Sequence, residues 1–127
     1  MMENYKFSTL EYKRPDLEAR RVKLAEWKDA AEHAENYAAL RALMLEIDRE
    51  TCELFTQYSI AHIRHTLDTR DEFYEAEIAY LQDTLPTLGG AEVALSEAIA
   101  SSPFRPDIEQ EFGKQYFVSM DLQKKLY

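Results

Sequence analysis

The fold of this chain is decided by residues 36–69, which read NYAALRALMLEIDRETCELFTQYSIAHIRHTLDT. Mostly apolar side chains recur along this stretch in steps of three or four residues: Leu40, Leu43, Ile47, Thr51, Leu54, Tyr58, Ala61 and His65. Such steps place side chains on one face of an α-helix. The stretch therefore predicts one long amphipathic helix, and Asn36 is suited to cap its N-terminus.

Helical patterns also lie on both sides of this stretch. Residues 15–33 predict a first helix, with Pro15 in its first turn and an apolar face made of Leu17, Leu24, Trp27 and Ala31. Residues 1–14 are expected to be irregular and to be anchored on the helices by Phe7, Leu10 and Tyr12. Residues 106–127 predict a fourth helix that reaches the end of the chain without a stop signal, as in a chain cut from a longer one.

Residues 71–101 predict a third helix that is interrupted. Pro86 removes one backbone hydrogen bond from this helix, and each glycine of Gly89-Gly90 weakens it by about 1 kcal/mol relative to alanine. We therefore expect a kink or a short break between residues 82 and 91.

Together these patterns predict an all-α fold in a single domain, residues 1–127. Only 3 glycines and 4 prolines occur among 127 residues, and the hydrophobic share of 46% is ordinary for a globular domain. Short connections between long amphipathic helices favour an antiparallel bundle or array of about four helices.

The charge balance argues against nucleic acid as a partner. The chain carries 24 acidic and 15 basic residues, a formal net charge of −9, and such a surface repels phosphate backbones. The densest basic stretch, from Arg14 to Lys28, is interleaved with Asp16, Glu18 and Glu26. We expect it to form a solvated helix face.

Compartment signals favour the cytoplasm. Cys52 is the only cysteine, so no disulfide can form within the chain, and a reducing compartment suits it. No apolar run approaches the roughly 20 residues that span a bilayer. The first residues lack the apolar core of a signal peptide.

His62 and His65 are the obvious candidates for a metal site, because residues three apart on a helix can approach one ion. Neither has the preceding glutamate that di-iron bundles use, and the chain contains no His-Glu-x-x-His pattern. We expect His65 to close the apolar stripe, held by Asp68 or Arg64. No metal ligand, catalytic residue or cofactor-binding residue is assigned in this chain.

A polar cluster marks the expected end of the long helix: Arg64, His65, Asp68, Arg70 and Asp71. Thr69 and Glu72 have the spacing of a capping box, so a tight connection should follow. Buried charges need partners, and such clusters specify geometry more than they stabilise. We favour a folding role, in which His65→Ala lowers the melting temperature; contact with a substrate is the alternative.

Other chemistry-bearing residues lack a supporting pattern. Cys52 lies beside Glu50 and Glu53, which oppose thiolate formation. No serine has the Gly-x-Ser-x-Gly setting, and Gly89-Gly90 is not part of a phosphate-binding loop. The acidic residues Glu72, Glu75, Glu77, Asp107, Glu109 and Glu111 are expected to face solvent.

Aromatic residues gather near the turn and on the expected fourth helix: Tyr58, Phe73, Tyr74, Tyr80, Phe112, Tyr116 and Phe117. Core packing is the simpler interpretation. The alternative is a surface that docks against further protein, because amphipathic rings are favoured at interfaces.

Three runs carry a family resemblance. They are Phe7 with Tyr12-Lys13-Arg14-Pro15-Asp16-Leu17-Glu18, then Arg64-His65-Thr66-Leu67-Asp68-Thr69-Arg70-Asp71-Glu72-Phe73-Tyr74, and last Ser102-Pro103-Phe104-Arg105 with Phe112-Gly113-Lys114-Gln115-Tyr116-Phe117. In order and spacing they resemble the N-terminal helical region of the oligoendopeptidase F family, zinc metallopeptidases of the thimet-oligopeptidase kind.

The resemblance implies architecture without chemistry. It implies a parent enzyme that cleaves short peptides with one zinc ion, whose N-terminal helices form a wall of a deep channel opposite the catalytic lobe. The zinc-binding residues of the family have no counterpart here, so this chain alone should be inactive. The implied partners are the missing catalytic lobe and oligopeptide substrates.

A second hypothesis is a stand-alone helical domain that binds a protein partner or self-associates through an exposed apolar face. It differs from the first in needing no further sequence. A large exposed apolar surface would favour a severed domain, and a small one a complete domain. A small metal-binding bundle using His62 and His65 is a weaker third possibility.

Overall fold

A computed structural model describes residues 11–117 of the chain, and these residues form an all-α array without any strand. The α-helices are α1 (Leu17–Glu32), α2 (Tyr37–Leu67), α3 (Glu72–Thr84), α4 (Gly89–Ala100) and α5 (Arg105–Phe112). Two short 3-10 helices, η3 (Leu85–Leu88) and η4 (Lys114–Phe117), follow α3 and α5. The predicted all-α fold is confirmed.

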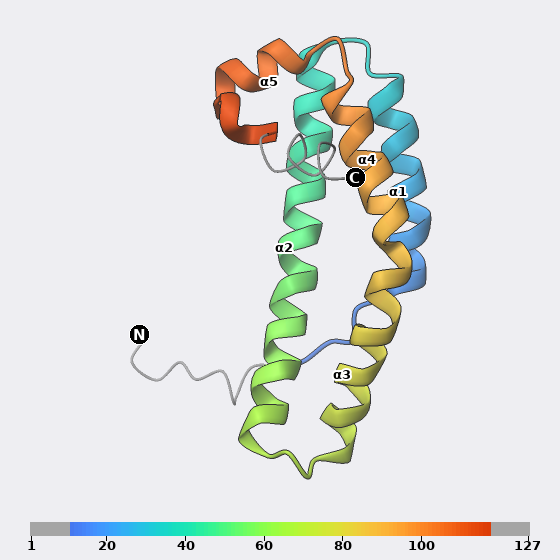
Figure 1. Ribbon diagram of the computed structural model, residues 1–127, viewed down its shortest axis with the longest axis vertical. Coiled ribbons are helices and arrows are strands. Elements are labelled where there is room, and N and C mark those ends of the chain that lie inside the picture. Colours follow the sequence, from blue (N-terminus) through green and yellow to red (C-terminus); the bar gives the residue numbers. More distant parts are fainter. Residues whose placement is uncertain (1–10, 118–127) are drawn as a thin grey trace, which may run out of the picture.

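The long helices stand as three rods (Figure 1). The first is α1, the second is α2, and the third is α3 continued through η3 into α4. Helix α1 packs most closely against α4, and α2 packs most closely against α3. Helix α2 runs antiparallel to both neighbouring rods, while α5 turns away at the end where α2 begins.

The first two helices begin at carboxylate and amide caps. Asp16 accepts a hydrogen bond from the backbone N–H of Ala19 (2.9 Å), and Asn36 accepts one from the N–H of Ala39 (2.8 Å). These bonds satisfy amides that have no partner inside the helix. The predicted cap at Asn36 is therefore confirmed, whereas Pro15 precedes the cap of α1 instead of lying in its first turn.

The cap of α3 differs from the sequence prediction. The Asp71 carboxylate accepts hydrogen bonds from the N–H groups of Phe73 (2.9 Å) and Tyr74 (3.3 Å). Helix α3 begins at Glu72, immediately after this residue. Thr69 is therefore not the cap, because a carboxylate already occupies that role closer to the helix.

The interruption of the third rod takes the form of a 3-10 turn. Leu85–Leu88 adopt this tighter helix directly after α3, with Pro86 in its first turn, where its missing N–H costs least. Gly89 continues in the right-handed helical region, with φ −53° and ψ −43°. The change of helix type lies within the predicted interval of residues 82–91, and the kink itself stays a prediction.

The fourth helix is much shorter than predicted. Helix α5 ends at Phe112, because Gly113 adopts φ +98° and ψ 153°, a conformation that side-chain-bearing residues avoid. The chain then forms η4, in which Phe117 is buried. The expectation of a single helix over 106–127 is wrong up to residue 117, and the rest of that range lies outside the described residues.

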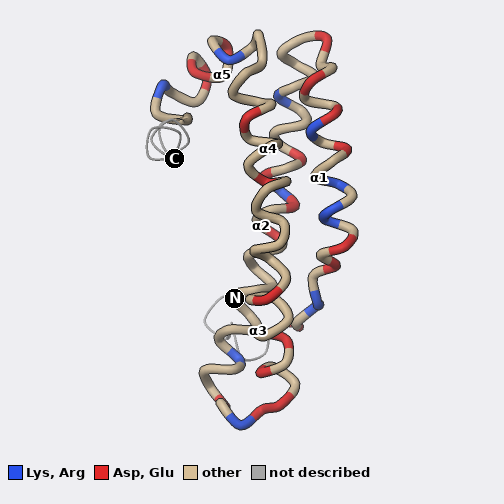
Figure 2. The backbone as a smooth tube through the Cα atoms, turned by 45° about the vertical axis from the view of Figure 1, so that its right-hand side comes forward, with Lys and Arg blue, Asp and Glu red and all other residues tan. Residues whose placement is uncertain are grey.

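One contiguous core joins all the rods. It contains the predicted apolar face of α1, namely Leu17, Leu24, Trp27 and Ala31. Of the predicted stripe of α2, Leu40, Leu54 and Ala61 are buried in this core, and Leu43, Ile47 and Tyr58 are partly buried against it. Figure 2 shows acidic and basic residues mixed along α1 and the other elements. Neither sign forms a continuous run along the α1 tube in this view, although the chain is acidic as a whole.

Candidate functional site between α1 and α2

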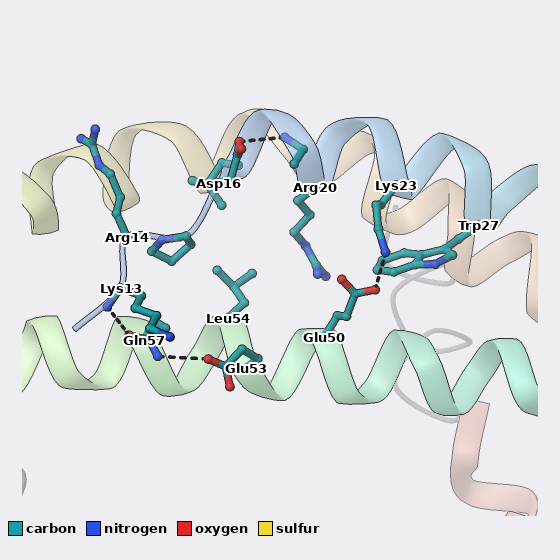
Figure 3. Close-up of a pocket in the computed structure, with 13 residues that line it drawn as sticks. Lys13, Arg14, Asp16, Arg20, Lys23, Trp27, Glu50, Glu53, Leu54 and Gln57 are labelled. Carbon is teal, nitrogen blue, oxygen red and sulfur yellow. Dashed lines mark hydrogen bonds and ion pairs between the residues drawn. The ribbon is translucent and has the colours of Figure 1, made fainter. Parts of the chain in front are cut away.

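A groove lies between α1 and α2 (Figure 3). Its volume is about 290 Å³. Apolar side chains of Leu17, Trp27 and Leu54 form much of its lining. The segment 11–16, which we call the strap, crosses to α1 and closes one end of the groove.

Arg20 enters the groove from α1 and is only 9% exposed. Its Nε donates to Oε1 of Glu92 on α4 (2.8 Å), and its Nη2 donates to the Thr51 hydroxyl on α2 (3.2 Å). The guanidinium carbon also lies 5.7 Å from the centre of the Trp27 ring. Arg20 thus joins three helices, and the predicted solvated face is wrong at this residue.

An ion pair crosses the groove near Trp27. Lys23 on α1 donates to Oε2 of Glu50 on α2 (3.0 Å), and both side chains are partly exposed. The hydrogen bond to Glu50 raises the pKa of Lys23. The Trp27 indole donates to Oε2 of Glu46 (2.8 Å), which satisfies its one polar atom. The exposed Lys23–Glu50 pair itself contributes little stability.

Gln57 ties the strap to α2. Its side-chain oxygen accepts the backbone N–H of Lys13 (2.7 Å), and its side-chain nitrogen donates to Oε1 of Glu53 (3.0 Å). Gln57 is 8% exposed, so these two bonds satisfy a buried amide. The Gln57 side chain on α2 thereby holds the backbone of the strap at one end of the groove.

Glu77 of α3 holds the other side of the strap. Its Oε1 accepts the Tyr12 hydroxyl (2.9 Å) and lies 3.1 Å from Nε of Arg14. Glu77 is 6% exposed, so the prediction that it faces solvent is wrong. Burial is the largest cause, and the hydrogen bond to Glu77 the second, of a pKa of Tyr12 that is raised above its usual range.

Tyr80 of α3 fixes the point where the strap becomes α1. Its hydroxyl donates to the carbonyl of Pro15 (3.1 Å) and accepts the N–H of Leu17 (3.3 Å). The Arg14 guanidinium lies 3.8 Å from the centre of its ring. Tyr80 and Glu77, both distant in sequence, therefore set the position of the α1 N-terminus.

The comparison with known families decides the chain's identity. The family model of the peptidase M3 N-terminal domain matches residues 7–127. The chain belongs to this family. The resemblance inferred from the three sequence runs is thereby confirmed.

Two solved structures resemble this M3 N-terminal domain closely. One is named as an oligoendopeptidase F; it is 36% identical, has a TM-score of 0.87, and covers 96% of this chain and 22% of its own. The other is PZ peptidase A with an inhibitor; it is 34% identical, has a TM-score of 0.81, and covers 88% of this chain and 20% of its own. The chain spans about a fifth of the length of each, and no curated protein matches it.

The polar cluster of the M3 N-terminal domain organises the turn between α2 and α3. Arg64 donates from Nη1 to the Tyr74 hydroxyl (3.0 Å), and Oδ1 of Asp68 accepts the N–H of Arg70 (3.0 Å). Asp71 caps α3. These contacts support a folding role for the cluster. The tie of His65 to Asp68 or Arg64 stays a prediction.

The described part of the domain offers no metal centre. In residues 11–117, no group of three or more His, Cys, Asp or Glu side chains is close enough to hold an ion. His62 is exposed, His65 is half-buried one turn further along α2, and Cys52 is exposed. The family's zinc therefore does not fit these residues.

The aromatic residues form two separate clusters. Tyr12, Phe73 and Tyr74 make edge-to-face contacts at the α2–α3 turn, with ring centres 4.9 to 6.3 Å apart. Phe112, Tyr116 and Phe117 form the second cluster at the end of α5. Each cluster has an exposed ring, Phe73 at 57% and Tyr116 at 41%. Core packing therefore applies to the buried rings such as Phe117, and docking against further protein stays a prediction.

Sequence reasoning missed the residues that shape the groove, above all Arg20, Gln57 and Glu77. All three occupy helical positions among other charged or polar residues, where exposure is the usual expectation. For Arg20 one signal was available, because it lies between Leu17 and Leu24 at helical spacing.

Proposed function

We propose that this chain is the channel-wall domain of an oligoendopeptidase F-like zinc metallopeptidase that cleaves short peptides. The observation that carries the proposal is the 36% identity with the oligoendopeptidase F over 96% of this chain, at a TM-score of 0.87. Identity of this size over a shared fold supports a shared place in the whole enzyme. The partners are then the catalytic lobe and oligopeptide substrates.

The proposal assigns no chemical step to this chain. In the family, zinc supplies an activated water for attack on the peptide carbonyl. No His-Glu-x-x-His pattern occurs in the 127 residues, and the described side chains do not gather around an ion. In this proposal the residues of this chain give the channel wall its shape, rigidity and charge. We expect the chain alone to hydrolyse no peptide.

Exposed apolar side chains support a partner lobe. Large hydrophobic residues with more than 40% of their surface exposed occur on several elements: Val22, Leu45, Phe55, Leu67, Phe73, Val93 and Tyr116. Scattered exposed residues are ordinary, but those near the α2–α3 turn, Leu67 and Phe73, lie close together in sequence. Self-association of a stand-alone interaction domain is the alternative use of such residues.

Two further observations bear on location. None of the described helices is both long and apolar enough to cross a bilayer. The exposed thiol of Cys52 suits a reducing compartment. As part of the same proposal, we place the enzyme in the cytoplasm.

A chimera tests the proposal. The corresponding N-terminal fifth of an intact oligoendopeptidase F is replaced by this chain, and hydrolysis of a quenched fluorescent oligopeptide is measured with and without a zinc chelator. We expect chelator-sensitive hydrolysis within about tenfold of the parent enzyme, which corresponds to a rise of at most about 1.4 kcal/mol in the activation free energy. A folded, zinc-loaded chimera without activity would argue for the stand-alone interaction domain.

A further inference from the structure

The α1–α2 groove contains a buried cation with hydrogen-bonding capacity to spare. Arg20 uses Nε for Glu92 and Nη2 for Thr51. Within residues 11–117, its Nη1 makes no hydrogen bond, and the side chain points into the groove (Figure 3). A guanidinium carries five N–H donors. Nη1 is not one of the fully buried donors of residues 11–117 that lack a partner, so it still contacts solvent inside the groove. It is therefore available to donate to an acceptor oxygen of a guest.

The two walls of the groove offer complementary groups. Donors come from α1, where Arg20 and Lys23 lie, whereas the α2 wall carries the carboxylates Glu50 and Glu53. Because Glu92 and Glu50 already pair with Arg20 and Lys23, the walls are close to neutral as a whole. A neutral guest that presents both acceptors and donors fits them better than a free anion or cation.

The shape of the groove also limits the guest. A volume of about 290 Å³ with an apolar lining of Leu17, Trp27 and Leu54 accommodates a few residues at most. One end of the groove already binds extended backbone, because the side-chain oxygen of Gln57 accepts the backbone N–H of Lys13 in the strap. An extended peptide supplies carbonyl acceptors, N–H donors and apolar side chains together.

We propose that the α1–α2 groove is a binding site for a short extended peptide, with a peptide carbonyl on Arg20 and peptide N–H groups on Glu50 or Glu53. The inference rests on the proposed function, since it gives the peptide of that enzyme a contact on the N-terminal domain. It concerns binding alone and involves no bond cleavage.

Trp27 provides the test, because it lines the groove and is the only tryptophan of the chain. The 127-residue chain is titrated with the capped, uncharged pentapeptide acetyl-Ala-Ala-Leu-Ala-Ala-amide, and tryptophan emission is followed. We expect a saturable change with a Kd of about 1 mM, as a small open groove allows. Amide chemical shifts, measured in parallel, should move at Lys23 and Gln57 and not at α5.

Two matched variants locate the binding. Ala19→Phe fills the groove from an exposed position that lines it, and Ala25→Phe adds the same ring at an exposed position of α1 outside it. Circular dichroism confirms that each variant keeps its helices. We expect Ala19→Phe to weaken binding at least tenfold and Ala25→Phe to leave it within twofold.

Three results would overturn the inference: no saturable change up to about 10 mM peptide, equal binding by both variants, or shifts confined to residues outside the groove. None of them would touch the proposed function, which the chimera tests through zinc-dependent hydrolysis. Conversely, an inactive chimera together with groove-specific binding would leave a peptide-binding domain without its proposed enzyme.

Discussion

At the scale of single residues, buried polar side chains position the strap and α1. Glu77 receives Tyr12 and Arg14, while Arg20 reaches Glu92 and Thr51. Each of these contacts joins positions more than 30 residues apart in sequence, so each fixes tertiary geometry that the helices alone do not define. Removing one partner of such a contact leaves a buried polar group unsatisfied, which costs more than the contact contributes.

Replacing Glu77 by glutamine should destabilise the domain. The amide keeps an acceptor for Tyr12 but loses the charge that faces Arg14, so we expect a loss of about 1–2 kcal/mol in the free energy of unfolding. Urea denaturation measures it. Glu26→Gln, at an exposed position of α1, is the control and should change stability by less than about 0.5 kcal/mol. Equal effects of the two substitutions would contradict the structural role of Glu77.

The cap of α3 gives a second prediction at this scale. Asp71→Ala should lower the free energy of unfolding by about 1 kcal/mol, because two amides of the first turn lose their acceptor. Thr69→Ala should change it by less than about 0.5 kcal/mol. Thermal and urea unfolding of both variants measure this. The reverse order would restore Thr69 as the cap, as its spacing from Glu72 had suggested.

At the scale of elements, helix positions were predictable, and the helix ends were predictable only where a cap dominates. Asn36 was recognised because an amide cap and a long apolar stripe agree. The end of α5 was missed because helical spacing continues beyond Gly113, and only the backbone conformation of that glycine shows the stop. A glycine in a helical pattern can either continue the helix or end it. At Gly113 we infer that the tertiary packing of Phe117, which is buried, decides that the helix ends.

Substitutions at Gly113 and Gly90 test the assigned end of α5, because Gly113 has a positive φ and Gly90 does not. Gly113→Ala forces a side chain into φ +98° and places its Cβ 2.8 Å from the Gln115 side chain, so we expect a loss of about 1–3 kcal/mol. Gly90→Ala lies in helix with no atom near its Cβ, so a gain of about 0.4–1 kcal/mol is expected. Denaturant midpoints of the two variants should therefore move in opposite directions. A shift in the same direction would contradict the assigned end of α5.

Alkaline pH should loosen the attachment of α5 to α2. The Tyr37 hydroxyl donates to Glu111, and Oε2 of Glu111 also accepts Nε of Arg41 (2.6 Å). Burial is the larger cause and the hydrogen bond to Glu111 the second; they raise the pKa of Tyr37 to about 12. A raised pKa means that the stabilising contribution is complete below the ordinary value near 10 and is lost as pH rises towards 12. Urea midpoints between pH 9 and 11 should fall less steeply for Tyr37→Phe than for the wild type. Parallel curves would contradict this coupling.

At the scale of the whole molecule, the family and the all-α architecture could be predicted from sequence, whereas the groove could not. The family depends on three runs whose order and spacing are visible in the sequence. The groove combines the strap with parts of α1 and α2, and with Glu92 of α4 behind it. Which charged or polar residue of a helix turns inward depends on the neighbouring helices, and local spacing offers a signal for Arg20 but not for Gln57 or Glu77. The same limit applied to Glu77, whose partners precede it by more than 60 residues.

The central claim is that this M3 N-terminal domain provides architecture and no catalysis. The most direct measurement is hydrolysis of a quenched fluorescent oligopeptide by the 127-residue chain with added zinc, beside an intact oligoendopeptidase F. We predict no hydrolysis above the buffer rate from the chain and a chelator-sensitive signal from the intact enzyme. Zinc-dependent cleavage by the purified chain itself would contradict the account, because its histidines and carboxylates would then have to form a catalytic site.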